Sequence, residues 1–377
     1  MALNHWVKVF AQRLRRDRDY WVRGAGKQDM AVLDAKPMIG YLATGILVLG
    51  LLRVGHAIFV PLAFSLFIIA LVAPLQIRLQ RWIPKLLALL VTLSATIFLI
   101  VAVGSSVTWG LSKLGQWLLV NARRFQDVYV HWTDWLEEHG IAIAGPLADR
   151  FDVTWLVGLT QGLAGRLNSF AGSALLVFVF VMLGLLEMED FGKRLGSPAL
   201  QPQGMNMLNA NREISRKLRR FMLVRTFASI STGLIVWAFA SFAGLELAAA
   251  WGAIAFALNY IPFLGPFVAT VLPTLFAIGQ FDSWQMALAV FAGLNLIQFL
   301  IGSYLEPLLT GASLAISPFA VIFSVFFWSF MWGVPGAFIG VPILIAFIIY
   351  CEKSSVAKWI AVLLSATSFD HSDKAPT

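Results

Sequence analysis

Long apolar blocks alternate with short polar stretches along this chain, and the polar stretches carry its charged residues. A helix needs about 20 apolar residues to cross the hydrocarbon core of a bilayer, which is about 30 Å thick. The blocks therefore predict an all-α integral membrane protein, built as a multi-span helical bundle. Those of roughly span length lie at residues 38–52, 57–75, 86–110, 169–186, 226–243 and 283–303.

Two further blocks, 247–279 and 318–350, are each about 33 residues long and would make single helices of roughly 50 Å. Proline and glycine interrupt both near the middle, at residues 259–266 (NYIPFLGP) and 333–336 (GVPG). Proline inside a helix removes a hydrogen bond and clashes with the preceding turn, so neither block should be one straight helix. We expect two re-entrant helical hairpins, because half-segments of about 12 to 15 residues cannot cross a bilayer unaided.

The two broken blocks suggest a repeat. A span followed by an outside hairpin (226–279) has the same plan as a span followed by an inside hairpin (283–350), in the opposite orientation. Inverted repeats with broken helices meeting near the midplane are typical of secondary transporters. Eight full spans would satisfy the same charge pattern, so that alternative stays open.

Composition and charge support this interpretation. Hydrophobic residues make up 59% and charged residues 13%, and the formal net charge is +8. The basic residues lie at the ends of apolar segments, which is typical of cytoplasmic loops and not of a nucleic-acid surface. Their densest cluster lies at 193–225, and with Lys353 and Lys358 it predicts a multi-pass membrane protein whose termini are both cytoplasmic.

The same patterns divide the chain into six parts. One of them, an insertion at residues 111–168, places apolar residues at helical spacing. It could pack on neighbouring spans, on the outer leaflet or on a partner subunit, and packing on a partner would favour a homo-oligomer. The parts are a basic amphipathic segment on inner-leaflet lipids (1–36), three transmembrane helices (37–110), an external amphipathic helical insertion (111–168), a transmembrane helix with a basic cytoplasmic loop (169–225), a transport core with both hairpins (226–350) and a cytoplasmic tail (351–377).

Candidate functional residues lie first at the two breaks. Asn259 and Tyr260 offer an amide and a phenol in a constrained turn, which could bind a polar solute or a cation. The alternative is that the turn only reverses the chain. The remaining candidates shape the turns or act as hinges through their backbone. They are Pro262, Gly265 and Pro266 in the first break, and Gly333, Pro335 and Gly336 in the second.

Three more candidates lie on the block 283–303 or at its end. Asn295 and Gln298 are three residues apart, hence on one helical face, and should face the protein interior as helix-joining groups or as lining of a path. Glu306 could couple transport by binding a proton or sodium. Alternatively, it is an interface residue that pairs with an arginine or caps a turn.

Enzyme chemistry is not supported. Cys351 is the only cysteine, which excludes an internal disulfide and a metal site of paired thiolates. The five histidines are scattered, and no histidine or carboxylate pair has metal-ligand spacing. No phosphate-binding glycine loop occurs either. We therefore expect no catalytic residues, no cofactor and no metal.

Several runs near the end of the chain resemble a known family. They are Tyr304-Leu305-Glu306-Pro307-Leu308-Leu309-Thr310-Gly311, Trp332-Gly333-Val334-Pro335-Gly336 and Gly340-Val341-Pro342, joined by the earlier NYIPFLGP run. Together they resemble the autoinducer-2 exporter family of bacterial inner-membrane proteins. The resemblance implies a multi-span exporter of small polar molecules, and some members are proposed to exchange sodium and protons.

This chain also departs from the family pattern. Gly302-Ser303 replaces a commonly polar Gly-Asn pair, and Leu308 and Ala312 stand where basic residues are frequent. The resemblance therefore does not fix the transported compound. The leading hypothesis is a secondary transporter that exports a small polar, autoinducer-like solute. The alternative is a channel or a structural membrane assembly protein without coupled transport.

Overall fold

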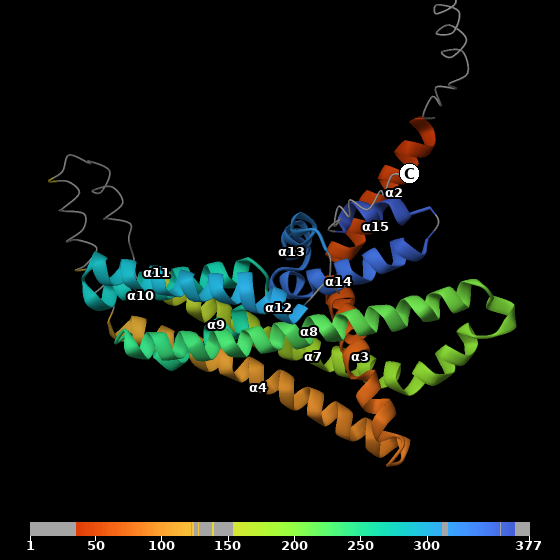
Figure 1. Ribbon diagram of the computed structural model, residues 1–377, viewed down its shortest axis with the longest axis horizontal. Coiled ribbons are helices and arrows are strands. Elements are labelled where there is room, and N and C mark those ends of the chain that lie inside the picture. The colour runs from red at the N-terminus through yellow and green to blue at the C-terminus, as the bar shows by residue number, and fades with distance from the viewer. Residues whose placement is uncertain are drawn as a thin grey trace, which may run out of the picture. The chain divides into compact units, whose positions relative to one another are not determined.

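The computed structural model describes residues 35–121, 123, 127, 138, 154–310, 316–354 and 356–365, and it is helical throughout its named elements (Figure 1). The expectations for residues 1–34, for most of the insertion after residue 121 and for the tail after residue 365 lie outside the described residues. Two compact units divide the chain at Gly55. In the first, α2 (Ala35–Val54) is a 20-residue helix that ends beside Arg53.

The second unit contains the remaining helices. Six of its described helices are long and apolar enough to cross a membrane, which confirms the prediction of an all-helical, multi-span protein. They are α3 (His56–Leu79), α4 (Lys85–Val120), α8 (Gln203–Phe242), α10 (Leu264–Phe281), α11 (Trp284–Leu300) with its continuation to Leu309, and α14 (Val334–Lys353). The other helices discussed below are α7 (Thr154–Leu195), α9 (Ala248–Leu258), α12 (Glu306–Thr310), α13 (Pro318–Trp332) and α15 (Lys358–Leu364).

Two helices extend past the boundaries expected from the apolar blocks. Helix α4 continues through Gly110 to Val120, so the first residues of the expected insertion prolong this helix. Its leucines 111, 114 and 118 are buried in the core, where they pack on neighbouring helices. Helix α8 begins at Gln203, and much of the stretch expected to be a basic loop is therefore helix. Buried Ala210, Ile214 and Leu218 follow one face of it at intervals of four residues.

Both long apolar blocks are broken, as predicted. The first consists of α9 and α10, and the second of α13 and α14. The two halves are unequal, with 11 and 18 residues in the first block and 15 and 20 in the second. The expected 12 to 15 residues per half is therefore met by α13 alone of these four helices. Pro335 lies in the first turn of α14, where a missing N–H costs no helical hydrogen bond.

The two breaks share two local features. Each has a residue with positive φ, Phe263 at 62° and Gly333 at 68°. Each is followed by a glycine packed against the preceding helix: a Cβ on Gly265 would lie 1.8 Å from the Leu258 carbonyl oxygen. A Cβ on Gly336 would lie 1.8 Å from the Trp328 carbonyl oxygen. The two helices of each pair can therefore pack this closely only with glycine at this position.

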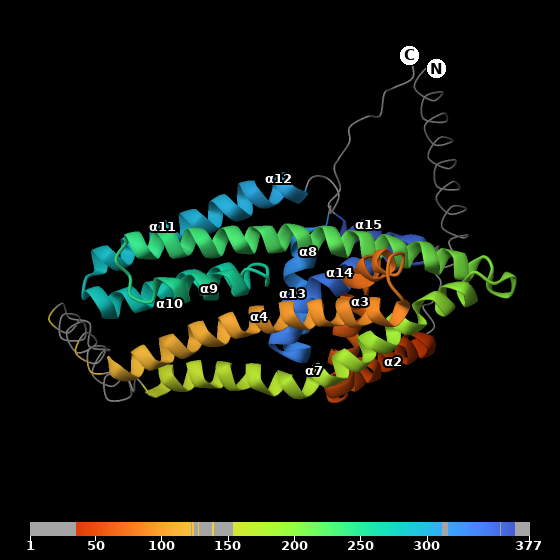
Figure 2. The ribbon, with the colours of Figure 1, turned by 90° about the horizontal axis from the view of Figure 1, so that it is seen from below.

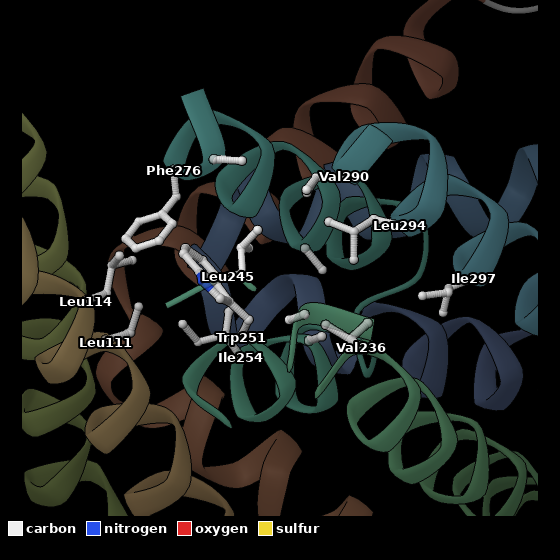
Figure 3. Close-up of a cluster of buried hydrophobic side chains, with 14 of the residues drawn as sticks. Leu111, Leu114, Val236, Leu245, Trp251, Ile254, Phe276, Val290, Leu294 and Ile297 are labelled. Carbon is white, nitrogen blue, oxygen red and sulfur yellow. The ribbon is translucent and has the colours of Figure 1, made fainter. Parts of the chain in front are cut away.

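Helix α8 contacts both helix pairs (Figures 1 and 2). Its second half packs with α9, α10, α11 and the end of α4 around Trp251, as Figure 3 shows. Gly233 and Gly252 allow α8 and α9 to cross closely, since a Cβ on Gly252 would lie 2.8 Å from the Gly233 carbonyl oxygen. The first half of α8 packs with α3 and α14, in a cluster that includes Ile214 and Ile345.

We expect Gly265→Ala and Gly336→Ala each to destabilise the protein, because the added methyl group meets a backbone carbonyl that cannot move aside. Overpacking of this kind costs about 1–3 kcal/mol, so the melting temperature in detergent should fall by about 1–4 °C. A fluorogenic thiol dye can follow unfolding through the buried Cys351. Gly104→Ala is the matched control, since a Cβ there meets nothing within 4 Å. Equal melting of all three variants would contradict the close packing of the two turns.

Candidate functional site

The first break contacts a short polar stretch of α8. Asn259 Nδ2 lies 3.4 Å from Ser229 Oγ, and the Tyr260 hydroxyl lies 3.2 Å from Thr226 Oγ1. Asn259 and Ser229 are almost completely buried, at 2% and 0% exposure. We call residues 225, 226, 229 and 232 the α8 polar segment. Thr232 completes it, and its hydroxyl donates to the Ala228 carbonyl oxygen.

Local sequence explains why these groups meet. Helix α9 has only 11 residues, and its last turn is followed directly by Asn259 and Tyr260, so their side chains leave the helix where it runs beside α8. In apolar surroundings an amide or hydroxyl without a partner costs about 1–3 kcal/mol. The threonine and serine of α8 supply those partners.

An aromatic contact joins the first break to the second helix pair. The Tyr260 ring lies 6.0 Å from the Phe338 ring of α14, between ring centroids. Phe338 also contacts two aromatic rings of α3, those of Phe64 at 5.8 Å and Phe67 at 6.2 Å. Tyr260 therefore touches α8 through its hydroxyl and α14 through its ring, which brings the first break against the beginning of α14.

The proline and glycine candidates mainly shape the two turns. Pro262 and Gly265 are buried, and Pro266 is partly buried. The Pro262 carbonyl accepts from the Leu264 N–H at 2.7 Å, and the Pro266 carbonyl accepts from the Thr270 hydroxyl at 3.0 Å. Several backbone groups of the first turn are thus used within the turn itself.

At the second break, Gly333 is exposed, Pro335 partly buried and Gly336 buried. The Gly333 N–H donates to the Ser329 carbonyl oxygen at 2.7 Å, which closes the last turn of α13. These three residues contribute backbone and shape, as the sequence indicates.

Glu306 forms an ion pair with Arg225 of the α8 polar segment. Arg225 Nη1 lies 2.6 Å from Glu306 Oε1, and the side chains are only 13% and 22% exposed. The guanidinium also lies 5.9 Å from the centre of the Phe221 ring. Of the two interpretations from sequence, pairing with an arginine is confirmed. The coupling role stays a prediction.

An irregular helical segment precedes Glu306. Residues Ile301–Leu305 form a π-helix, and the Glu306 N–H donates to the Ile301 carbonyl oxygen. Pro307 lacks an N–H and would clash in a regular helix, so the wider turn accommodates it. Single π-helical turns are frequent at functional sites.

Asn295 and Gln298 occupy different surroundings although they are three residues apart. Asn295 is exposed, and its Nδ2 donates to the Phe291 carbonyl of its own helix at 2.8 Å. The expectation that it faces the interior of this chain is therefore not met. Gln298 is partly buried, and its Nε2 has no hydrogen-bond partner among the described residues. One helical face is wide enough to place one amide outside and the other inside.

Sequence reasoning missed the partners on α8. Thr226, Ser229 and Thr232 lie in a block that was interpreted only as a span, and Arg225 was assigned to a loop. The sequence does contain a pattern that indicates them. Arg225, Ser229 and Thr232 are spaced by four and three residues and therefore share one helical face. Among the described residues, no group of three His, Cys, Asp or Glu side chains could hold a metal ion.

Comparisons with known proteins identify the family of the chain. A family model described as AI-2E family transporter matches residues 42–355. The AI-2 transport protein TqsA of Escherichia coli (strain K12) is 29% identical over 331 residues, which are 87% of this chain and 94% of that protein. A putative transport protein of Haemophilus influenzae is 24% identical over 342 residues, covering 87% of this chain and 96% of the relative.

The putative transport protein YrrI of Bacillus subtilis is 26% identical over 306 residues, 76% of this chain and 83% of its own length. The family match covers most of the chain, including α3, α8 and both helix pairs. The protein is thus a multi-pass membrane protein related to bacterial transporters, in a family of transporters and not of enzymes. We conclude that the chain belongs to the AI-2E transporter family.

Proposed function

We propose that this protein is a secondary transporter that exports a small polar solute across the bacterial inner membrane, with both termini in the cytoplasm. The observation that carries the proposal is the contact of Asn259 and Tyr260 with the α8 polar segment, at the place where the first break meets α14. Transporters bind solutes where broken helices expose polar groups near the membrane midplane.

The lengths of the first helix of each pair support re-entrant hairpins. Helix α9 has 11 residues and α13 has 15, which correspond to about 17 Å and about 23 Å. Neither reaches across a hydrocarbon core of about 30 Å, so each break lies within the membrane. The longer α10 and α14 then return to the surface from which the chain entered.

The order of elements supports an inverted repeat. Helix α8 precedes the pair α9–α10, and α11 precedes the pair α13–α14; in both pairs the short helix comes first. Basic residues place the start of α8 on the cytoplasmic side, so the two units enter the membrane from opposite faces. We assign the core to residues 226–350 and the scaffold to the helices before it.

The site favours a neutral solute with several hydrogen-bonding groups. The side chains of Asn259, Tyr260, Thr226 and Ser229 are uncharged, and the nearby charges of Arg225 and Glu306 neutralise each other. In this conformation these groups bond to one another, so the first break must move from α8 to admit a solute. The buried Gln298 amide could then donate to a solute oxygen.

The remaining candidates take supporting roles in this proposal. The prolines and glycines at 262, 265, 266, 333, 335 and 336 fix the hairpin turns and act as hinges. Glu306 is the site where a proton or sodium couples transport, because a cation there would replace Arg225 as its partner. Asn295, exposed on α11, faces membrane lipid or a second copy of the chain in a homo-oligomer.

Flux measurements test the proposed activity. AI-2 is the first solute to try, because the name of the relative TqsA says that it transports AI-2. We expect purified protein in proteoliposomes to move AI-2, and an imposed pH or sodium gradient to drive it against its own gradient. Movement only down the AI-2 gradient would identify a channel. Absence of AI-2 flux from protein that retains its melting transition would rule out this solute.

We expect Tyr260→Phe to lower AI-2 flux roughly two- to tenfold, as loss of one hydrogen bond worth about 0.5–1.5 kcal/mol predicts. The ring contact with Phe338 remains, so the melting temperature should change by no more than about 3 °C. Tyr304→Phe is the matched control, since Tyr304 is 64% exposed and its ring contacts Phe299 of the same span. Equal AI-2 flux in the two variants would show that the Tyr260 hydroxyl does not contact the solute.

A further inference from the structure

Three arginines near the middle of α8 each bond to a different part of the chain. Arg219 Nη1 donates to the Ala70 carbonyl oxygen of α3 at 3.1 Å. Arg220 Nη2 donates to the Leu309 carbonyl oxygen of α12 at 2.6 Å. Arg225 pairs with Glu306 at 2.6 Å. One helix thus holds two other elements, α3 and α12, through guanidinium groups.

Two of the three acceptors, the carbonyls of Ala70 and Leu309, lie where a helix lacks a donor of its own. Ala70 is four residues before Pro74, whose missing N–H leaves the Ala70 carbonyl without its helical partner. Leu309 lies in the last turn of α12, where carbonyls have no helical donor. The carboxylate of Glu306 stands beside Pro307 at the end of the π-helix. The arginines therefore supply bonds that α3 and α12 cannot make for themselves.

The two elements held in this way pack in different clusters. Helix α3 packs on Phe338 of α14 through Phe64 and Phe67, whereas α12 continues α11 through the π-helix, whose Ile301 packs in the cluster around Trp251. Helix α8, by contrast, leads directly into α9 and crosses it closely at Gly233. The three bonds therefore connect α8 to α3 and to the end of the α11 span, at the basic end of the α8 polar segment.

We propose that Arg219, Arg220 and Arg225, together with Glu306, form the inner gate of the transport path. The inference rests on the proposed function. Ser229 lies one turn of α8 beyond Arg225 and is fully buried, so the gate closes the polar segment from the cytoplasmic side. Opening requires Arg225 and Glu306 to separate, since that bond joins α8 to the end of the α11 span through charged groups that are mostly buried.

The gate can be tested without knowing the solute. In a background with Cys351→Ala, a single cysteine replaces the buried Ser229, and inside-out vesicles are treated with a membrane-impermeant maleimide. We expect Arg225→Gln and Glu306→Gln each to raise the labelling rate at position 229 by at least about tenfold, the factor that corresponds to about 1.4 kcal/mol. Arg225→Lys keeps the charge and should stay within about threefold of the parent.

Two controls separate gating from general loosening. Arg212→Gln removes an exposed arginine of the same helix and should leave labelling at position 229 unchanged. A cysteine in place of Val181, buried in the α3–α4–α7 cluster, should label slowly in every variant. The exchanged pair Arg225→Glu with Glu306→Arg should bring labelling at position 229 back to within about threefold of the parent.

An unchanged labelling rate at position 229 in both Arg225→Gln and Glu306→Gln would overturn the gate proposal. An equal rise at positions 229 and 181 would also overturn it, because the variants would then loosen the whole fold. AI-2 flux in the same vesicles keeps the two proposals distinguishable. Gate-dependent labelling without AI-2 flux would support the gate and reject the solute, whereas coupled AI-2 flux with unchanged labelling would reject the gate alone.

Discussion

Polar groups that are freed where a helix breaks inside apolar surroundings must find partners within the protein, because lipid offers none. In this chain α8 provides many of them. Ser229 and Thr226 meet the side chains at the first break, and Arg219 meets the carbonyl freed by a proline in α3. Arg225 neutralises the acid beside a second proline. Helix α8 thus stabilises the first break and the helical irregularities near Pro74 and Pro307.

This constraint also links the two helix pairs. The first pair follows α8 along the chain and packs on its second half, whereas α14 packs on its first half. Tyr260 contacts both α8 and Phe338, so it lies where the pairs meet. A movement of either pair relative to α8 must exchange these polar contacts for others. Water, a solute or a coupling ion can provide the replacements, which connects the proposed transport cycle to the same few bonds.

The sequence was sufficient for the helical membrane class, for both breaks and for the family. These follow from local properties: apolar length, the φ of proline and glycine, and short motifs. It did not predict the extent of α4, because Gly110 marks close packing and not an end; a Cβ there would lie 3.1 Å from Ile254. Nor did it predict that basic residues of α8 continue a helix, since their charge masked the buried face at Ala210 and Leu218.

The partners of the candidate residues depend on tertiary structure, which local patterns do not contain. That Glu306 would meet an arginine was one of two interpretations, but which arginine follows only from the packing of α8 beside α12. The Ala70 carbonyl is freed by Pro74, yet its donor is 149 residues away. Asn295 and Gln298 show the same limit, because equal spacing and equal chemistry led to one exposed amide and one buried one.

The depth of the two turns in a bilayer tests the central claim most directly. Spin labels at positions 263 and 334, which carry the exposed Phe263 and Val334, can be measured by electron paramagnetic resonance with oxygen and a water-soluble nickel reagent as competing relaxers. Re-entrant hairpins predict that both labels lie deep in the hydrocarbon, with oxygen dominant. A label at the level of the lipid headgroups, at either position, would contradict the account.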